Sequence, residues 1–364
     1  MLSSLEIHGL RGIEAAKLEG LAPLTILVGP NGSGKSTILE ASGIACAGLS
    51  IHAAFKALAA REWLGLAGMS FWLTGKPETK ILARFDSRPF SYSRRDDAFA
   101  CTIELSKSDA SDVWMFPHAR EVNEQGPVMG LASSIWIEGE DGYSTNAAVV
   151  NEDGVVIWTD TGDKPFFPFS LHSLFVDRPA GALRRLRDPL FSSALREAIS
   201  AIKLSAWYDD FFSYLKVLRP ELSSIESLAV GDRDEPFIFE SQPRRGYPLA
   251  YAGDGFRRAL LVAASLAQAR GGIAAMDEPE AFSHPRMFPT LAHLIHRAVG
   301  DGTQVIFATH SLEFVEAALR EFKDTPEKAC VVGLKMDGGK IDPVTVSGPD
   351  AYTRVVEWKD DLRL

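Results

Sequence analysis

A glycine-rich segment, GPNGSGKST at residues 29–37, constrains the fold of this chain more than any other feature. It follows an apolar run at residues 24–28 that predicts a buried strand, and it precedes a run with helical spacing. The pattern GxxxxGK[ST] between a strand and a helix is typical of a phosphate-binding loop. Its glycines let backbone N–H groups face phosphate oxygens, and the helix start adds partial positive charge. We therefore expect an α/β nucleotide-binding fold.

The residues of this loop have distinct expected roles. Lys35 would reach the β- and γ-phosphates of ATP as a point charge, and the Ser36 hydroxyl would be a ligand of Mg²⁺. Thr37 is expected to assist at the α-phosphate. The loop residues expected to bind the nucleotide are Gly29, Pro30, Asn31, Gly32, Ser33, Gly34, Lys35, Ser36 and Thr37.

The length of 364 residues exceeds what one core usually spans, so we expect several regions. Residues 1–78 would form the N-terminal part of the nucleotide-binding head. Residues 79–182 would form an antiparallel β-rich layer, in which residues 153–154 indicate a hairpin turn and residues 165–180 read as a loop rich in proline and aromatic residues. Residues 183–248 would form a helical segment with return strands. In residues 249–364, helical patterns at 256–269, 286–299 and 312–322 alternate with strand patterns at 273–276 and 304–308, which predicts parallel strands in an α/β sheet.

We expect a cytoplasmic protein without membrane insertion. The first residues lack a basic stretch followed by an apolar core, and charged residues interrupt the apolar segment 41–72. Three widely spaced cysteines fit buried thiols rather than a disulfide frame or a zinc site. The net charge of −10 argues against wrapping nucleic acid by bulk electrostatics, although a local basic stripe would still allow it.

Two apolar strand patterns end in residues suited to phosphate chemistry. In IAAMDEPE (273–280), Asp277 would hold the Mg²⁺ shell and Glu278 would polarise the attacking water. In QVIFATHS (304–311), His310 would reach the same edge of the sheet and sense the γ-phosphate. The alternative for Asp277 and Glu278 is that they cap the next helix or face solvent. The alternative for His310 is a helix-capping or core histidine. The predicted catalytic residues are Glu278, Lys35 and His310, and the predicted metal ligands are Ser36 and Asp277.

A second glycine-rich turn opens an apolar helix at residues 251–267. Gly253, Asp254 and Gly255 would expose backbone N–H groups, and Arg257 or Arg258 would add positive charge. One chain needs only one such site per nucleotide, so this turn is expected to complete the site of a second copy in a two-fold homodimer. The alternative is a tight turn with ordinary capping.

In this order, the motifs resemble an ABC-class ATPase of the RecF/SMC-like branch. They are LRG (10–12), the phosphate-binding loop, GDGFRR (253–258), AMDEPE (275–280) and FATHS (307–311). More narrowly, the chain resembles prokaryotic AAA family ATP-binding proteins related to the ATPase half of overcoming-lysogenization-defect (OLD) nucleases. The terminal EWKDDLRL is similar to the acidic-then-DLR ending of many of those proteins.

The resemblance implies further roles. Arg11 would reach the bound nucleotide, although a surface arginine is an equal alternative, and Gly255 would contact the γ-phosphate held by the partner copy. Gly253 replaces the serine of the family signature, which puts that hydroxyl contact in doubt. His284 falls where the family has its D-loop, and only candidates can be given for the glutamine of the Q-loop. These candidates are Gln125 and Gln242.

The expected function is an ATPase that dimerises on ATP and Mg²⁺. Its cycle would act on DNA or on an effector protein, such as a nuclease or toxin encoded nearby, and the resemblance implies genome maintenance or phage defence. A long coiled coil is excluded because no sustained heptad pattern lies between Lys35 and Asp277. About fifty residues follow His310, too few for the OLD nuclease domain.

Three other functions remain open. An ABC transporter's nucleotide-binding subunit is disfavoured by the divergent signature and the β-rich insertion. A small-molecule phosphotransferase is disfavoured because the adjacent acids and the histidine favour water as the acceptor. An ATP-gated binding module with negligible turnover is compatible with the sequence.

Overall fold

The computed structural model describes residues 1–48, 78–86, 99–108, 128–137, 143–150, 156–158, 169–173, 199, 202–204, 206–230, 233–281 and 283–363. Within them, a thirteen-stranded mixed sheet has the order β8-β7-β6-β5-β4-β1-β2-β16-β15-β3-β14-β13-β9. Its strands are β1 (Leu2–Leu10), β2 (Ile13–Glu19), β3 (Leu24–Val28), β4 (Glu78–Phe85), β5 (Phe99–Ser108), β6 (Val128–Ile137), β7 (Tyr143–Val150), β8 (Val156–Trp158), β9 (Phe169–Ser173), β13 (Ile273–Asp277), β14 (Gln304–Ala308), β15 (Ala329–Asp337) and β16 (Lys340–Ser347).

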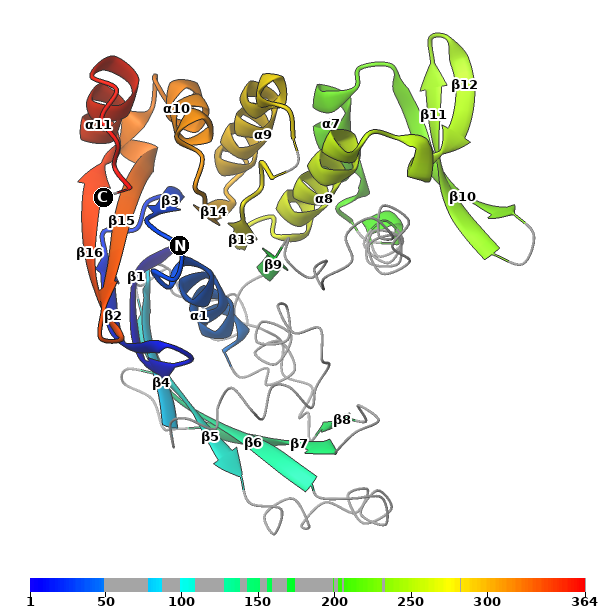
Figure 1. Ribbon diagram of the computed structural model, residues 1–364. Coiled ribbons are helices and arrows are strands. Elements are labelled where there is room, and N and C mark those ends of the chain that lie inside the picture. The colour runs from blue at the N-terminus through cyan, green and yellow to red at the C-terminus, as the bar shows by residue number, and fades with distance from the viewer. Residues whose placement is uncertain are drawn as a thin grey trace.

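Helices cover both faces of the parallel part of this sheet (Figure 1). Helix α1 (Lys35–Ala47) lies on one face, and the other helices that the structure describes lie on the opposite face. These are α7 (Tyr208–Leu218), α8 (Asp254–Gln268), α9 (Phe288–Gly300), α10 (Leu312–Glu321) and α11 (Gly348–Ala351), with the short turns η3 (Leu249–Tyr251), η4 (Pro285–Met287), η5 (Pro326–Lys328) and η6 (Tyr352–Glu357). A second, antiparallel sheet contains β10 (Leu222–Val230), β11 (Arg233–Ser241) and β12 (Arg244–Pro248).

The central strands are buried along their whole length because side chains on both faces enter a core. In β3, Ile26 and Val28 pack in the cluster that includes α8, α9 and α10, whereas Leu27 packs in the cluster that includes α1. All five residues of β3, β13 and β14 are buried. Continuous apolar runs of this kind are typical of parallel strands covered on both faces.

The predicted alternation of helices and parallel strands in residues 249–364 is confirmed. Strand β13 pairs in parallel with β14, and β14 pairs in parallel with β3. The expected bounds agree with those of α8, β13, α9, β14 and α10 to within about two residues, the usual uncertainty of element ends. The parallel register brings the ends of β3, β13 and β14 to one edge of the sheet.

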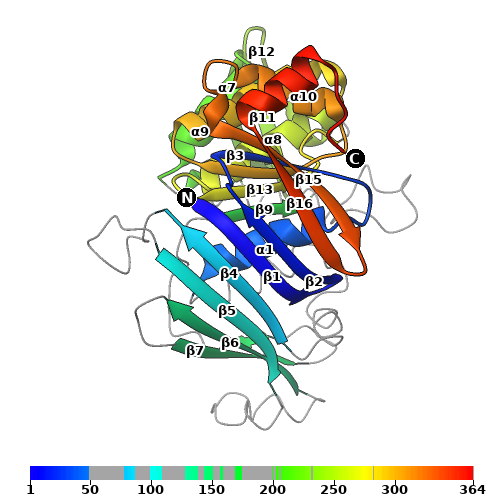
Figure 2. The same ribbon diagram turned by 90° about the vertical axis from the view of Figure 1, so that its left-hand side faces the viewer.

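The middle of the chain confirms one expectation and corrects another. Strands β4 to β8 are antiparallel as predicted, and they continue the large sheet from β1 (Figure 2). Residues 165–180 were expected to form a loop, yet they contain β9, which pairs in parallel with β13 at the far edge. Pairing with a strand about a hundred residues away overrode the local loop signal.

Several predicted features lie partly outside the described residues. These include the segment 49–72, the hairpin turn near residue 153 and most of residues 183–207. The strands on either side of that turn, β7 and β8, do pair antiparallel. Among the helices that the structure describes, none is long and apolar enough to cross a bilayer. The three cysteines are buried free thiols, and burial raises the pKa of Cys101 to about 12.

Candidate functional site

The phosphate-binding loop leaves β3 and enters α1 in a conformation that its glycines make possible. Gly29, Gly32 and Gly34 have φ values of 148°, 77° and 89°, which L side chains rarely adopt. A Cβ atom at Gly29 would lie 2.4 Å from the carbonyl oxygen of Leu334, so β15 also excludes a side chain there. Gly34 caps α1, and no side chain among the described residues caps this helix end. The first N–H groups of α1 can therefore bind an anion.

The side chain of Lys35 folds back over the loop. Its Nζ donates hydrogen bonds to the carbonyl oxygens of Gly29 (2.8 Å) and Pro30 (2.9 Å). Burial lowers the pKa of Lys35, while the carboxylates of Asp277 and Glu278 act in the opposite direction. The lysine is thus electrostatically coupled to the two acids that the sequence placed in the same site.

Strands β13 and β14 bring the predicted catalytic acid and histidine together. Asp277 lies opposite Ala308 in the parallel register, and the N–H of Glu278 donates to the carbonyl oxygen of Ala308 at 2.8 Å. His310 follows β14, and its Nε2 lies 3.9 Å from Oε1 of Glu278. The two strand ends therefore meet at one edge, as the motif spacing predicted.

Glu278 adopts a strained backbone conformation, with φ of 47°. Among the described residues, the other non-glycine residues with positive φ are Arg11 (52°) and Lys359 (62°). A left-handed conformation costs a side-chain-bearing residue about 1–2 kcal/mol. Strain of this kind is concentrated at functional sites, where the surrounding structure holds it in place.

His310 is held through its backbone by a C-terminal arginine. Nη1 of Arg363 donates to the carbonyl oxygen of His310 at 2.8 Å, and Nη2 of Arg363 lies 2.6 Å from Oδ2 of Asp361. Burial lowers the pKa of His310, and Lys35 lowers it further, so the imidazole is neutral at neutral pH. The sequence pattern predicts no role for Arg363, which belongs to the terminal DLR segment.

A third acid, Glu280, also belongs to this site and was missed. It is 7% exposed, and its Oε1 accepts a hydrogen bond from the hydroxyl of Thr309. Burial raises the pKa of Glu280 to about 7, although the hydrogen bond from Thr309 acts in the opposite direction. The motif IAAMDEPE contains this residue, but metal binding and activation of water account only for its first two acids, Asp277 and Glu278.

Ser36 and Asp277 offer the oxygen donors that a magnesium ion prefers. Ser36 lies in the first turn of α1, and Asp277 is buried, 3% exposed, at the end of β13. Helix α1 packs against β13, so both donors belong to one region of the molecule. Mg²⁺ usually binds one or two protein oxygens together with water and substrate phosphates, and these residues fit that requirement.

Arg11 lies in the turn between β1 and β2 and forms an ion pair with Glu40 of α1. Its Nε donates to Oε2 of Glu40 at 2.6 Å, and the two side chains are only 11% and 1% exposed. The pair attaches this turn to the helix that follows the phosphate-binding loop. The contact of Arg11 with nucleotide, implied by the resemblance, stays a prediction.

The second glycine-rich turn, residues 253–255, lies at the start of α8, as expected. Gly253 is exposed at the N-cap, and a Cβ atom at Gly255 would lie 3.8 Å from Cα of Ser283. Arg258 is buried, 5% exposed, and its charge acts to lower the pKa of Glu280 in the same chain, against the rise that burial causes. A role for this turn, or for Arg258, at the nucleotide of a second copy stays a prediction.

The remaining candidates lie elsewhere. Nδ1 of His284 accepts a hydrogen bond from the N–H of Arg286 at 3.2 Å and caps η4. Gln242 lies in the turn between β11 and β12, on the second sheet. Gln125 lies outside the described residues. The structure therefore does not bring Gln242 to the strand edge that carries Asp277.

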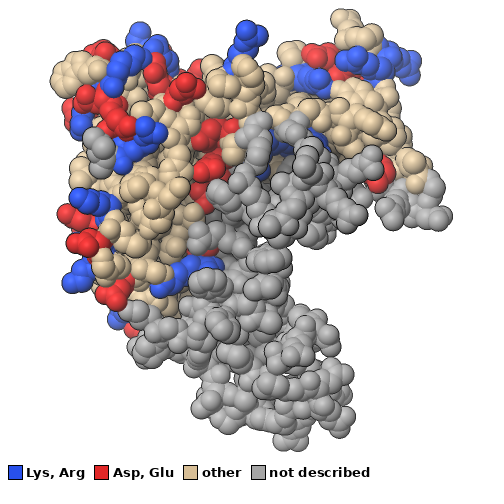
Figure 3. Space-filling model, viewed as in Figure 1, with Lys and Arg blue, Asp and Glu red and all other residues tan. Residues whose placement is uncertain are grey.

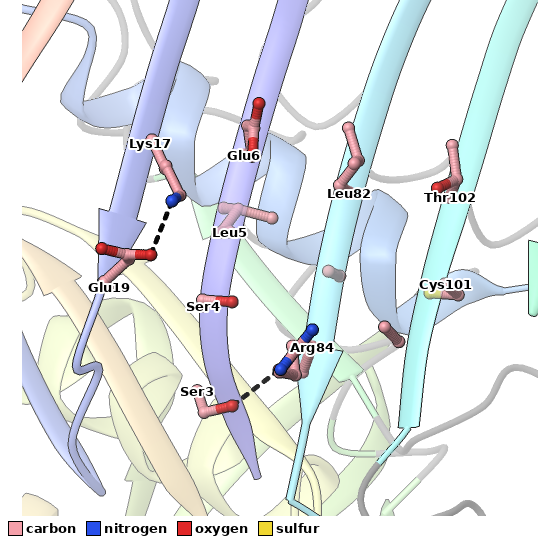
Figure 4. Close-up of a pocket in the computed structure, with 12 residues that line it drawn as sticks. Ser3, Ser4, Leu5, Glu6, Lys17, Glu19, Leu82, Arg84, Cys101 and Thr102 are labelled. Atoms are coloured by element: carbon pink, nitrogen blue, oxygen red, sulfur yellow. Dashed lines mark hydrogen bonds and ion pairs between the residues drawn. The ribbon is translucent and has the colours of Figure 1, made fainter. Parts of the chain in front are cut away.

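Acidic side chains gather near the centre of the face in Figure 3, over the region where β13 and β14 lie in Figure 1. The pocket in Figure 4 is a different feature. It lies on the outer face of β1, β2, β4 and β5, where Lys17 pairs with Glu19 at 2.7 Å and the hydroxyl of Ser3 donates to the carbonyl oxygen of Arg84. No predicted nucleotide, metal or catalytic residue lines this pocket.

Comparison with known protein families matches two parts of the chain that together carry the site. A family described as "AAA domain" matches residues 4–56, which include the phosphate-binding loop. A family described as "AAA domain, putative AbiEii toxin, Type IV TA system" matches residues 173–316, which include Asp277, Glu278 and His310. An uncharacterized protein of Methanocaldococcus jannaschii, MJECL11, is 25% identical over 111 residues, which are 30% of this chain and 94% of that protein.

Solved structures of SMC head domains are similar in fold. An SMC head bound to the C-winged helix domain of ScpA has a TM-score of 0.53 at 15% identity, covering 95% of this chain and 97% of that chain. An SMC head domain with an extended coiled coil, bound to the C-terminal domain of ScpA and derived from Pyrococcus furiosus, has the same TM-score and identity and covers 99% of both chains. The chain has the P-loop NTPase fold, as predicted. The family matches are to AAA domains, and the fold is similar to that of SMC heads. The SMC/RecF-like and the narrower OLD-like relations stay predictions.

Proposed function

We propose that this chain binds ATP with Mg²⁺ at residues 29–37 and hydrolyses it, and that two copies associate around two ATP molecules. The observation that carries this proposal is the 3.9 Å approach of Glu278 to His310 at the edge of the sheet, beside the lysine of the phosphate-binding loop. A loop that only binds phosphate has no need of a strained acid next to a histidine. This pair suits the activation of water at a γ-phosphate.

Each residue of the site has a role in this reaction. Ser36 and Asp277 would hold Mg²⁺, which neutralises charge on the phosphates when it is bound. Lys35 would exchange its bonds to the loop carbonyls for bonds to the β- and γ-phosphates. Glu278 would accept a hydrogen bond from the attacking water and orient it. The neutral imidazole of His310 would donate a hydrogen bond to the γ-phosphate.

The turn at residues 253–255 would complete the site of a second copy. It is the N-terminus of a fifteen-residue helix, with exposed Gly253 at its cap, so its N–H groups can bind an anion. A two-fold dimer would then contain two identical shared sites. ATP would hold the copies together, and hydrolysis would release them.

We further propose that the cycle acts on an effector protein or on DNA, in the cytoplasm, in phage defence or genome maintenance. The description of one matching family names a toxin–antitoxin system, which supports a defence role. The similar SMC heads are described in complex with domains of ScpA, which supports a protein as effector. ATPase activity should then respond to the effector, and a response to DNA should weaken as salt rises if DNA binds directly.

The variant Glu278→Gln tests the proposal. It should still bind ATP, lose hydrolysis and accumulate as a dimer on a sizing column with ATP and Mg²⁺. Glu321→Gln is a matched control, because Glu321 lies 3.1 Å from His293 in a second glutamate–histidine pair outside the site. Lys35→Ala should lose ATP binding. A Glu278→Gln variant that hydrolyses ATP at the wild-type rate refutes the catalytic role, and one that stays monomeric refutes the shared site.

A further inference from the structure

A buried contact links the chain segments that carry the catalytic acid and the histidine. The hydroxyl of Thr309, which is fully buried, donates a hydrogen bond to Oε1 of Glu280. The same Thr309 oxygen accepts a hydrogen bond from the N–H of Ser311 at 2.9 Å. His310 lies between Thr309 and Ser311, the two residues that these bonds hold. The backbone on both sides of the histidine is therefore fixed by one hydroxyl and one carboxyl group.

Burying this carboxyl group lowers the stability of the fold, which argues that the contact has a functional role. A carboxyl group loses solvation when it is buried, and an apolar side chain of similar volume would occupy such a position at lower cost. In the described part of the chain, Oε2 of Glu280 is buried and has no hydrogen-bond partner. Only one carboxyl oxygen is thus bonded, and that bond goes to the residue next to His310.

The same segment also lies beside the glycine-rich turn of α8. The carbonyl oxygen of Glu280 accepts a hydrogen bond from the N–H of Ser283 at 2.9 Å. A Cβ atom built at Gly255 would lie 3.8 Å from Cα of Ser283, so these two residues are neighbours. Ser283, which is hydrogen-bonded to Glu280, therefore lies next to Gly255, and Glu280 is in turn hydrogen-bonded to Thr309.

We infer that Glu280 is a positioning residue for ATP hydrolysis: through Thr309 it fixes the place of His310, and through Ser283 it links that histidine to the turn at residues 253–255. The inference rests on the proposed function. It adds that the turn expected to meet a second copy lies next to the segment that positions the histidine of its own chain. A displacement of about 1 Å is enough to cost a reaction about a hundredfold in rate, so the contact can control turnover without touching ATP.

Thr309→Val tests the connection, because valine keeps the shape of threonine and removes the hydroxyl. We expect kcat for ATP hydrolysis to fall about tenfold or more, with the Kd for ATP within about twofold of the wild-type value. Thr309→Ser restores the hydroxyl and should recover most of the rate. Thr303→Val is the matched control, since Thr303 is also buried, at 1% exposed, and its hydroxyl makes no hydrogen bond within the described residues.

Variants of Glu280 provide the second arm. Glu280→Met keeps the length of the side chain and removes the acceptor, so it should lower kcat as much as Thr309→Val does. Glu280→Gln keeps an acceptor oxygen and should stay within about threefold of the wild-type kcat. The double variant Glu280→Met/Thr309→Val should be no slower than either single variant, because both remove the same contact.

The outcomes separate this inference from the proposed function. If wild-type protein does not hydrolyse ATP, both fail. If wild-type protein hydrolyses ATP and Thr309→Val has the wild-type kcat, the inference alone is overturned. It is also overturned if the rate losses of the single variants multiply in the double variant, or if Thr309→Val loses ATP binding, which would indicate a structural role.

Discussion

The buried carboxyl of Glu280 should make the stability of this protein depend on pH, and Glu280→Gln should remove that dependence. Burial raises the pKa of Glu280 from 4.5 to about 7, and the charge of Glu278 acts in the same direction. The hydrogen bond from Thr309 and the charge of Arg258 oppose the rise. The folded state therefore binds this proton more tightly than the unfolded chain. Its stabilising effect is fully present below pH 4.5 and is lost as the pH rises through about 7.

The magnitude follows from the two pKa values. The difference between 4.5 and about 7, at 1.36 kcal/mol per pH unit, corresponds to about 3 kcal/mol. Glutamine is neutral at every pH and can still accept the hydrogen bond from Thr309. The free energy of unfolding of Glu280→Gln, measured relative to wild type, should therefore increase by about 3 kcal/mol between about pH 4 and about pH 8.

Urea unfolding followed by far-UV circular dichroism, without nucleotide or Mg²⁺, measures this difference across the pH range. Glu321→Gln is the control for the loss of one carboxylate, because Glu321 lies outside the site and its side chain is 29% exposed. If wild type and Glu280→Gln lose stability in parallel as the pH rises, the carboxyl is not held protonated by its surroundings, and the reasoning from burial is refuted.

Three further predictions concern residues around the same site. Glu278→Gly should unfold with a free energy about 0.5–1 kcal/mol higher than Glu278→Gln in urea, because glycine tolerates a φ of 47°; no gain would show that the turn is unstrained. Arg363→Ala should lower kcat for ATP hydrolysis about tenfold with little change in ATP affinity. Arg320→Ala, which removes an exposed ion pair, should leave kcat unchanged, and equal rates for both variants would contradict a role of Arg363 in placing the histidine. Arg11→Met should destabilise the fold by about 3–5 kcal/mol because it leaves Glu40 buried without this partner, and adding Glu40→Gln should recover most of the loss. Normal ATP binding by that double variant would show that Arg11 does not contact the nucleotide.

The sequence predicted those parts of the site that depend on local pattern. A strand, a glycine-rich turn and a helix in direct succession identify a phosphate-binding loop, because all the required N–H groups belong to consecutive residues. The positions of Asp277 and His310 followed from one further rule, that the ends of parallel strands meet at one edge. The observed register, with Asp277 opposite Ala308, agrees with that rule.

The parts that were missed depend on contacts between distant residues. Glu280 and Thr309 are 29 positions apart, and Arg363 lies 53 positions from His310. No periodicity or motif records which side chain meets which across such distances. The same reason explains why β9 was missed, because this short segment forms a strand by pairing with β13 at the edge of the sheet. Arg11 was noticed from its motif, but its pairing with Glu40 depends on how α1 packs against the sheet.

The contacts around His310 suggest why a site for such simple chemistry involves so much of the chain. Its imidazole lies 3.9 Å from Glu278, its carbonyl oxygen is held by Arg363, and its neighbour Thr309 is held by Glu280. None of these contacts requires bound ATP. The place of the histidine is therefore set by the C-terminal segment and by Glu280, whose hydrogen-bonded neighbour Ser283 lies beside the turn of α8. Under the proposed function, a partner that shifts either segment would change the distance from His310 to Glu278, and the rate of hydrolysis would then respond to a partner that never reaches the nucleotide.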